Sequence, residues 1–120
     1  MLKHVHRSVV IIGGGPAGLA AAIAAREAGC PDPLVLERDR LRGGILNQCI
    51  HDGFGLHRFG ETMTGPEYAQ RYIDRFDELG LEAQTGSMVL SLSPDREILV
   101  SRHGELTQFS ADAVVLAMGC

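Results

Sequence analysis

The chain has 120 residues, of which 45% are hydrophobic, and a formal net charge of −4. This length suits one domain with a modest core, and the negative charge gives no general attraction to nucleic acid or to anionic membranes. The three cysteines, Cys30, Cys49 and Cys120, form no CxxC pair, so neither a disulfide framework nor a zinc finger is indicated, and a reducing, cytoplasmic location is expected.

The first strong motif is VVIIGGGPAG, from Val9 to Gly18. Four β-branched residues run into a glycine turn and then into a small-residue helix pattern. This predicts a strand over Val5–Ile12 and a helix over about Ala17–Ala28. Basic residues before an apolar run can also mark a signal peptide, but the glycines and Pro16 interrupt this run. Nothing else approaches about 20 consecutive apolar residues, so no membrane span is expected.

The glycine turn has the GxGxxG spacing of a dinucleotide cradle. Gly13 would permit the tight turn off the strand, Gly15 would let backbone approach a pyrophosphate, and Gly18 would let the helix pack closely on the sheet. Pro16 suits the first helical position. The free amides and the dipole of the helix N-terminus would attract an anion, so the motif predicts a phosphate site.

A second apolar run, Leu34–Glu37, ends in an acid nineteen residues after Gly18. About 20 residues is the separation expected for the acid that binds the ribose hydroxyls of a dinucleotide. A carboxylate accepts hydrogen bonds from a ribose diol and repels a 2′-phosphate, so an adenosine with a free ribose is favoured. Gly29 would end the first helix, and the continuous apolar run predicts a buried strand of a parallel sheet.

A long polar loop over Arg38–Gly65 follows, and loops of this length are more often functional than idle. Pro66 and Glu67 then suit the start of a second helix, which Gly80 would end before a short strand over Leu81–Thr85. The apolar stripe of this helix is expected to lie in the core and consists of Tyr68, Tyr72, Ile73, Phe76 and Leu79.

From Ser87 the apolar period changes to two, and turn signals divide the segment up to Phe109 into three strands of an antiparallel meander. A separate, buried strand is expected over Ala113–Met118. The expected fold is therefore an α/β Rossmann-like domain in which a parallel sheet carries an antiparallel three-stranded meander.

This ordered combination resembles the FAD domain of the two-dinucleotide-binding flavoproteins, the pyridine nucleotide-disulfide oxidoreductases. The resemblance rests on GGGPAG, Glu37, the Gly43-Gly44 pair, the meander and the AVVLAMG run. A closer likeness, carried by Gly43–Tyr72 and the final AMGC, is to NAD(P)/FAD-dependent oxidoreductases associated with a glycerol-3-phosphate dehydrogenase-like subunit. The resemblance implies FAD as the cofactor. The implied contacts are to the pyrophosphate from Gly13, Gly15, Pro16, Ala17 and Gly18, to the ribose from Glu37, and to the adenine from Arg38 and the Val89 backbone. Gly43 and Gly44 would let backbone approach the phosphate and ribityl portion, and Gly119 would pass near the cofactor.

Two departures from this family pattern affect the expected activity. The positions of the redox cysteines of the disulfide reductases hold Leu46 and His51, which argues against a thiol–disulfide reaction. The chain also ends before the NAD(P)H domain and the returning FAD segment of the family. We therefore expect the N-terminal part of an FAD-dependent NAD(P)H oxidoreductase, inactive by itself, whose catalytic residues are unknown.

Alternatives to this interpretation stay open from the sequence. One is a non-catalytic nucleotide-binding or subunit-interface module, which would assemble with a partner dehydrogenase subunit or with itself. Direct NAD binding, as in a simple dehydrogenase, is less favoured because the meander replaces the next parallel unit. Cys49, His51 and His57 match no zinc spacing, so no metal is expected, although either histidine could contact the flavin or a substrate anion.

Overall fold

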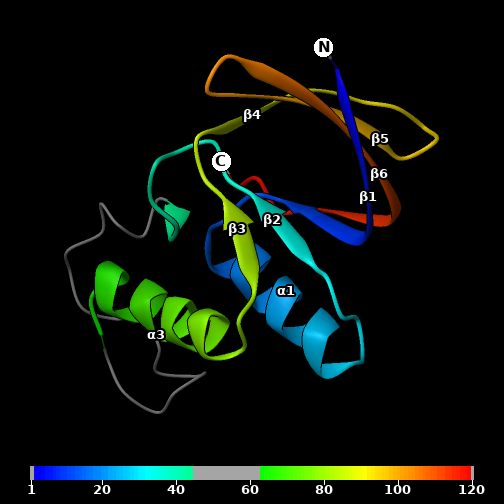
Figure 1. The fold of residues 1–120 in the computed structure, drawn as a ribbon. Coiled ribbons are helices and arrows are strands. Elements are labelled where there is room, and N and C mark those ends of the chain that lie inside the picture. The colour runs from blue at the N-terminus through cyan, green and yellow to red at the C-terminus, as the bar shows by residue number, and fades with distance from the viewer. Residues whose placement is uncertain (1, 45–62, 120) are drawn as a thin grey trace.

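The computed structural model describes residues 2–44 and 63–119. Within them, a six-stranded sheet has the strand order β3-β2-β1-β6-β5-β4, with its two helices on one side (Figure 1). The elements are, in chain order, β1 (Lys3–Ile12), α1 (Pro16–Glu27), β2 (Leu34–Leu36), α3 (Gly65–Glu78), β3 (Glu82–Gln84), β4 (Ser87–Leu92), β5 (Glu97–Arg102) and β6 (Glu105–Leu116).

The sheet combines the two strand arrangements that the sequence predicts. Strands β3, β2, β1 and β6 pair in parallel, whereas β6, β5 and β4 form the antiparallel meander. The β1–β6 ladder is the longest and runs from the Lys3–Thr107 pair to the Ile12–Leu116 pair. The predicted fold class is confirmed.

The prediction of a separate, buried last strand is wrong on both points. Strand β6 runs continuously over Glu105–Leu116, because β1 pairs with it in the same register before and after Ser8 and Asp112, which are not paired. On the other edge, β5 pairs with β6 only as far as Ser110. Beyond that point Leu116 is 57% exposed, and Met118, just after the strand, is 65% exposed.

The position predicted for a strand break is instead a bend in the sheet. Side chains of a strand alternate between its two faces, yet Val5, Val10 and Ile12 of β1 all pack in one cluster. In β6 the same cluster takes Phe109 and then Val114, so both strands change face between these positions. The meander consequently curls over the parallel strands instead of extending their plane (Figure 1).

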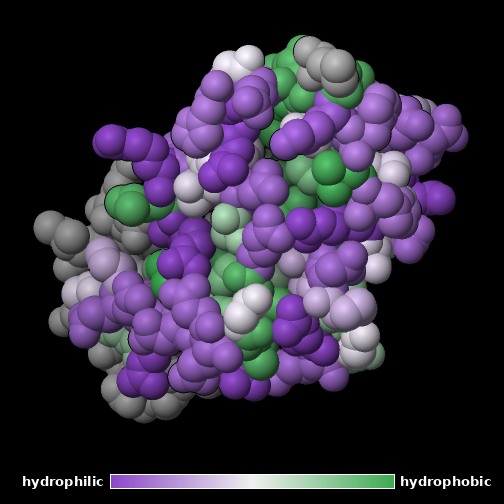
Figure 2. Space-filling view, viewed as in Figure 1, coloured by the Kyte–Doolittle hydropathy of each residue, from purple (hydrophilic) through white to green (hydrophobic). Residues whose placement is uncertain are grey.

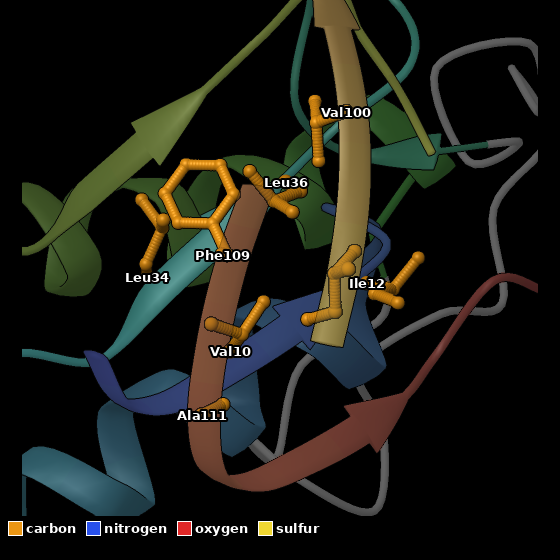
Figure 3. Packing of buried hydrophobic residues seen from close by; sticks show 8 residues of the cluster. Val10, Ile12, Leu34, Leu36, Val100, Phe109 and Ala111 are labelled. Atoms are coloured by element: carbon orange, nitrogen blue, oxygen red, sulfur yellow. The ribbon is translucent and has the colours of Figure 1, made fainter. Parts of the chain in front are cut away.

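Two apolar clusters cover the two faces of the parallel strands. In the cluster on the concave face, the ring of Phe109 lies between Leu34 and Leu36 (Figure 3). Alternate residues of β1 and β2 point to the opposite face, beneath α1 and α3, as expected for parallel strands buried on both sides. The buried members are Val10, Ile12, Leu34, Leu36, Ile98, Val100, Phe109 and Ala111 on the concave face, and Ile11, Leu19, Ala22, Val35, Phe76 and Leu81 on the helix face.

The helix ends follow the sequence signals closely. Helix α1 begins at Pro16 and is followed by Gly29, whose φ is +108°. Helix α3 begins with a capping box, in which the Glu67 amide donates to Thr64 Oγ1 and the Thr64 amide donates to the Glu67 carboxylate. Four members of its predicted apolar stripe pack on the helix-face cluster: Phe76 is buried, and Tyr72, Ile73 and Leu79 are partly buried. The fifth, Tyr68, is not part of this cluster and packs edge-on against Tyr72, with 5.3 Å between the ring centroids.

In the described ranges, no helix is long and apolar enough to cross a membrane.

Candidate nucleotide-binding site

The glycine turn lies where β1 ends between its two parallel neighbours. The Gly13 amide donates to the Leu36 carbonyl of β2 at 2.9 Å, and the Ala117 amide donates to the Ile12 carbonyl at 2.8 Å. The turn is therefore fixed at the carboxyl ends of three adjacent strands. In open α/β sheets this edge is where ligands bind.

Two glycines of the turn are required by packing within the chain. Gly13 has a φ of +115°, and a Cβ there would overlap the Ala117 carbonyl oxygen. A Cβ at Gly18 would overlap the Gly13 carbonyl oxygen. Gly18 thus lets α1 start directly against the turn, as the sequence predicts, and both residues are explained without a ligand.

Gly15 differs from its neighbours because the described residues do not require a glycine there. Its φ of −75° and ψ of −176° are extended values that any residue can adopt. A Cβ at Gly15 would lie 3.7 Å from the Gly44 Cα, which is an ordinary van der Waals contact. This position is the N-cap of α1, whose N-terminus has no side-chain cap among the described residues. Within residues 2–44 and 63–119, no cap from the Gly15 side competes with a ligand for the first-turn amides.

The double glycine returns to the turn and packs on its backbone. The Gly43 amide donates to the Gly14 carbonyl at 2.8 Å. Gly44 has a φ of +61°, and a Cβ there would lie only 3.1 Å from the Gly15 Cα. The structure thus brings the double glycine next to the turn, although 25 residues separate Gly18 from Gly43.

Glu37 is buried, with 7% of its surface exposed, at the end of β2. Its Oε1 accepts from the Gly14 amide at 2.8 Å, and its Oε2 accepts from the Asp39 amide at 2.7 Å. Its backbone is fixed as well, since its amide donates to Gln84 and its carbonyl accepts from Ser87. The carboxylate therefore lies beside the turn, as a ribose-binding acid would. The sequence reasoning assigned no role to Gly14, although a third glycine inside the motif could have suggested one.

The remaining predicted positions lie around the same edge of the sheet. Arg38 follows Glu37 directly and is exposed. Val89 lies two residues beyond Ser87 on β4, beside a bulge between Val89 and Ser91, and its side chain packs on the concave-face cluster. Gly119, with a φ of +70°, is two residues past the Ala117 carbonyl that contacts Gly13.

The opposite end of the sheet carries charged pairs. The Arg7 guanidinium donates to the Glu82 carboxylate at 2.7 Å and joins β1 to β3. Burial alone would raise the pKa of Glu82, but hydrogen bonds from Arg7 and Gln84 outweigh it, and the pKa lies below the usual value of 4.5. A hydrogen bond from Ser8 lowers the pKa of Asp32 in the same region. These groups stabilise strand ends away from the glycine turn.

A hollow of about 710 Å³ lies elsewhere, between the Arg40–Arg42 segment, α3 and β3. No predicted cradle residue lines it. A dinucleotide cradle in this fold is an open crevice at the strand ends, made mostly of backbone. We therefore place the candidate site at the glycine turn.

Some predicted positions lie outside the described residues. These are Leu46, Cys49, His51 and His57, on which the expectations about a thiol pair, a metal and a flavin contact depend. Over residues 2–44 and 63–119, no group of three or more His, Cys, Asp or Glu side chains could hold a metal ion.

Comparison with known proteins agrees with this geometry. A family model described as pyridine nucleotide-disulphide oxidoreductase matches residues 7–120. Hydrogen cyanide synthase subunit HcnB from Pseudomonas protegens is 32% identical over 117 residues, covering 92% of this chain and 24% of that protein. L-proline dehydrogenase from P. horikoshii has the same fold, with a TM-score of 0.81 and 22% identity over 99% of this chain and 24% of that one. Thioredoxin reductase from Lactococcus lactis gives a TM-score of 0.73 and 25% identity over 94% of this chain and 35% of that one. The chain thus spans 24% to 35% of the length of these three proteins.

Proposed function

The chain belongs to the pyridine nucleotide-disulphide oxidoreductase family, and we propose that its glycine turn, Glu37 and double glycine hold FAD as part of a flavin-dependent NAD(P)H oxidoreductase. The observation that carries this proposal is Gly15. Packing explains Gly13 and Gly18, whereas the described residues leave room for a side chain at Gly15. A ligand that comes close to the backbone at the N-terminus of α1 explains this glycine.

The residues around the turn fit the pyrophosphate of FAD. Pro16 has no amide hydrogen, so the amides of Ala17 and Gly18 are the donors that the first turn of α1 offers to an anion. No acidic side chain lies in that first turn, so none opposes the favourable helix dipole. The double glycine beside Gly15 leaves only backbone on that side of the phosphate path.

Glu37 fits the adenosine ribose. An ionised carboxylate has about four acceptor positions on its two oxygens, and the Gly14 and Asp39 amides use one on each oxygen. The remaining positions can accept from the ribose hydroxyls. Arg38 and the Val89 backbone would lie at the adenine, and Gly119 would lie near the more distant part of FAD.

Bound FAD supplies the electron-transfer chemistry, while these residues supply its position and its electrostatic environment. We assign the 120 residues to the N-terminal part of an FAD-binding domain, with NAD(P)H bound by a different domain of the whole protein. The isolated chain should then bind FAD or ADP weakly and should not turn over NAD(P)H. Rapid NAD(P)H oxidation by the isolated chain would contradict this assignment. The closer likeness to enzymes with a glycerol-3-phosphate dehydrogenase-like subunit stays a prediction, as does the cytoplasmic location.

A second candidate function is a subunit-interface module. Apolar side chains of the meander and of the β6 end are exposed: Met88, Leu90, Leu106, Leu116 and Met118. Apolar surface also gathers near the N-terminal end of β1, at the top of the view in Figure 2. Contiguous apolar surface favours association, and the relative HcnB is named as a subunit. Size-exclusion chromatography tests this candidate, and a clean monomer at high concentration counts against it.

Calorimetric titration of the 120-residue chain with FAD and ADP tests the nucleotide proposal. Glu37→Ala should abolish measurable ADP binding, because it removes the ribose acceptor. Asp95→Ala is the matched control, since it removes an exposed carboxylate at the β4–β5 turn. This turn lies at the opposite end of β4 from Ser87, whose amide donates to the Glu37 carbonyl. Equal ADP affinity in the two variants would refute the proposed role of Glu37. Absence of ADP and FAD binding to the unmodified chain would refute the binding proposal itself.

A further inference from the structure

Both carboxylate oxygens of Glu37 are held by backbone amides from two different segments. The Gly14 amide comes from the glycine turn, and the Asp39 amide comes from the loop after β2, at 2.8 Å and 2.7 Å respectively. The carboxylate is buried, and hydrogen bonds to a charged group are stronger than neutral ones. The orientation of the carboxylate plane is therefore set before any nucleotide arrives.

Gly14 can approach Glu37 only because it has no side chain. A Cβ at Gly14 would lie 3.0 Å from the Glu37 Oε1, 3.1 Å from its Cβ and 3.3 Å from its Cγ. Such distances are shorter than side chains normally tolerate, so Glu37 would have to move by a few tenths of an ångström. Gly14 does not have the positive φ of Gly13, and the three described atoms nearest to its added Cβ all belong to Glu37.

We infer that Gly14 is a positioning residue for ribose recognition, an inference that rests on the proposed function. Gly14 holds the acid so that each oxygen gives one acceptor position to the protein and keeps another for a hydroxyl of the ribose diol. An alanine would displace the carboxylate from this arrangement without touching the pyrophosphate path at Gly15. Gly14 thus determines how strongly the site prefers a ribose with both hydroxyls.

The inference separates the roles of two adjacent glycines by the part of the nucleotide that each affects. Gly14→Ala should weaken only the contacts to the ribose hydroxyls, because it acts through Glu37. Gly15→Ala should weaken every nucleotide with a pyrophosphate to the same degree. The two substitutions add the same methyl group to neighbouring positions, so each is a control for the other.

The test compares ADP with 2′-deoxy-ADP by calorimetry in the 120-residue chain. The unmodified chain should prefer ADP by about tenfold, the value of one hydrogen bond to a charged group. Gly14→Ala should remove most of that preference, because it should lower the affinity for ADP more than the affinity for 2′-deoxy-ADP, which can lose only the 3′-hydroxyl contact to Glu37. In a Glu37→Gln background, Gly14→Ala should have little further effect on the preference.

The outcomes distinguish failure of the inference about Gly14 from failure of the proposed nucleotide-binding function. Equal weakening of ADP and 2′-deoxy-ADP by Gly14→Ala overturns the positioning role and leaves the proposed function intact. Failure of the unmodified chain to bind ADP overturns the proposed function and this inference together. If Gly14→Ala does not fold, 15N NMR replaces it: the Gly14 and Asp39 amide resonances should shift on Glu37→Gln and on adding ADP. Unmoved resonances would also overturn the inference.

Discussion

Replacing Gly15 by alanine should impair nucleotide binding without unfolding the protein. The backbone at Gly15 is extended, and the new Cβ would lie 3.7 Å from the Gly44 Cα, so the substitution introduces no clash among the described residues. Alanine is a poorer helix N-cap than glycine, whereas the reduced freedom of the unfolded chain favours alanine. The free energy of unfolding should therefore stay within about 1 kcal/mol of the unmodified value.

The effect on binding should be larger than the effect on folding. If the pyrophosphate lies against the Gly15 backbone, a methyl group occupies part of its space, and the anion moves away from the first-turn amides of α1. We expect ADP affinity to fall at least about tenfold, which corresponds to about 1.4 kcal/mol. Calorimetry measures this change, and urea denaturation of the same sample measures the stability.

Gly18→Ala is the contrasting variant. Its Cβ would overlap the Gly13 carbonyl oxygen. This oxygen belongs to the backbone and cannot rotate away, because the Gly13 amide is hydrogen-bonded to the Leu36 carbonyl. Overpacking of this kind costs about 1–3 kcal/mol, a large part of the roughly 5–15 kcal/mol that stabilises an average domain. If Gly15→Ala binds ADP normally, or if it destabilises the chain as much as Gly18→Ala does, the distinction between these glycines is wrong.

Three further predictions concern the stability of the fold. Phe109→Ala should lower the free energy of unfolding, measured by urea titration, by about 3–5 kcal/mol, because Phe109 is only 2% exposed. Leu106→Ala is the control on the same strand. Leu106 is 45% exposed, so its replacement should change the free energy of unfolding by no more than about 0.5 kcal/mol. Thr64→Ala should remove about 1 kcal/mol through loss of the α3 capping box, and an unchanged thermal midpoint would argue against that role. Glu82 has a lowered folded-state pKa, so its contribution is present above its unfolded pKa and is lost as pH falls through the folded value. Arg7→Gln should flatten the pH dependence of the urea midpoint as pH falls below the usual glutamate pKa of 4.5, and an unaltered pH profile would show that the Arg7–Glu82 pair contributes nothing.

Local signals explain why the first half of the site could be predicted from the sequence. The strand, turn, helix and acid of Val9–Glu37 each depend on residues within a few positions of one another, such as Pro16 at the first helical position. The capping box of Thr64 and Glu67 is equally local, and it places the start of α3 correctly. Short-range preferences agree with the tertiary structure at these positions, so the sequence pattern is sufficient.

The bend in β6 could not be read from the sequence for a physical reason. Whether Phe109 and Val114 belong to one strand depends on their pairing with β1, whose residues Val5 and Val10 lie about one hundred positions earlier. When the alternation of apolar side chains along one strand changes phase, that strand considered alone looks like two separate strands. Strand β1 changes phase at the same place, so the pairing register is the same on both sides of Ser8 and Asp112 and the strand bends there without ending.

The role inferred for Gly14 was missed for a related reason. Its close neighbour is Glu37, 23 residues later, and the GxGxxG pattern treats position 14 as variable. The contacts of the double glycine with the backbone of Gly14 and Gly15 were not expected from the sequence either, whereas its expected approach to FAD stays a prediction. Contacts between two loops at the end of a sheet depend on the assembled fold, and neither loop encodes them alone.

The glycines of the turn are required for three different physical reasons. Gly13 and Gly18 satisfy packing between backbone segments, Gly14 leaves space for the acid, and Gly15 leaves space for a ligand in the proposed function. The site presents backbone amides where most binding sites present side chains, so no donor can be deleted by truncation. Replacing one of these glycines can only add atoms. The added atom meets a different group at each position, and that group determines whether folding, ribose preference or pyrophosphate affinity changes. Alanine variants at Gly13, Gly14, Gly15 and Gly18 should therefore give distinct effects on these quantities, whereas in a purely structural turn none of them would change ribose preference or pyrophosphate affinity independently of stability.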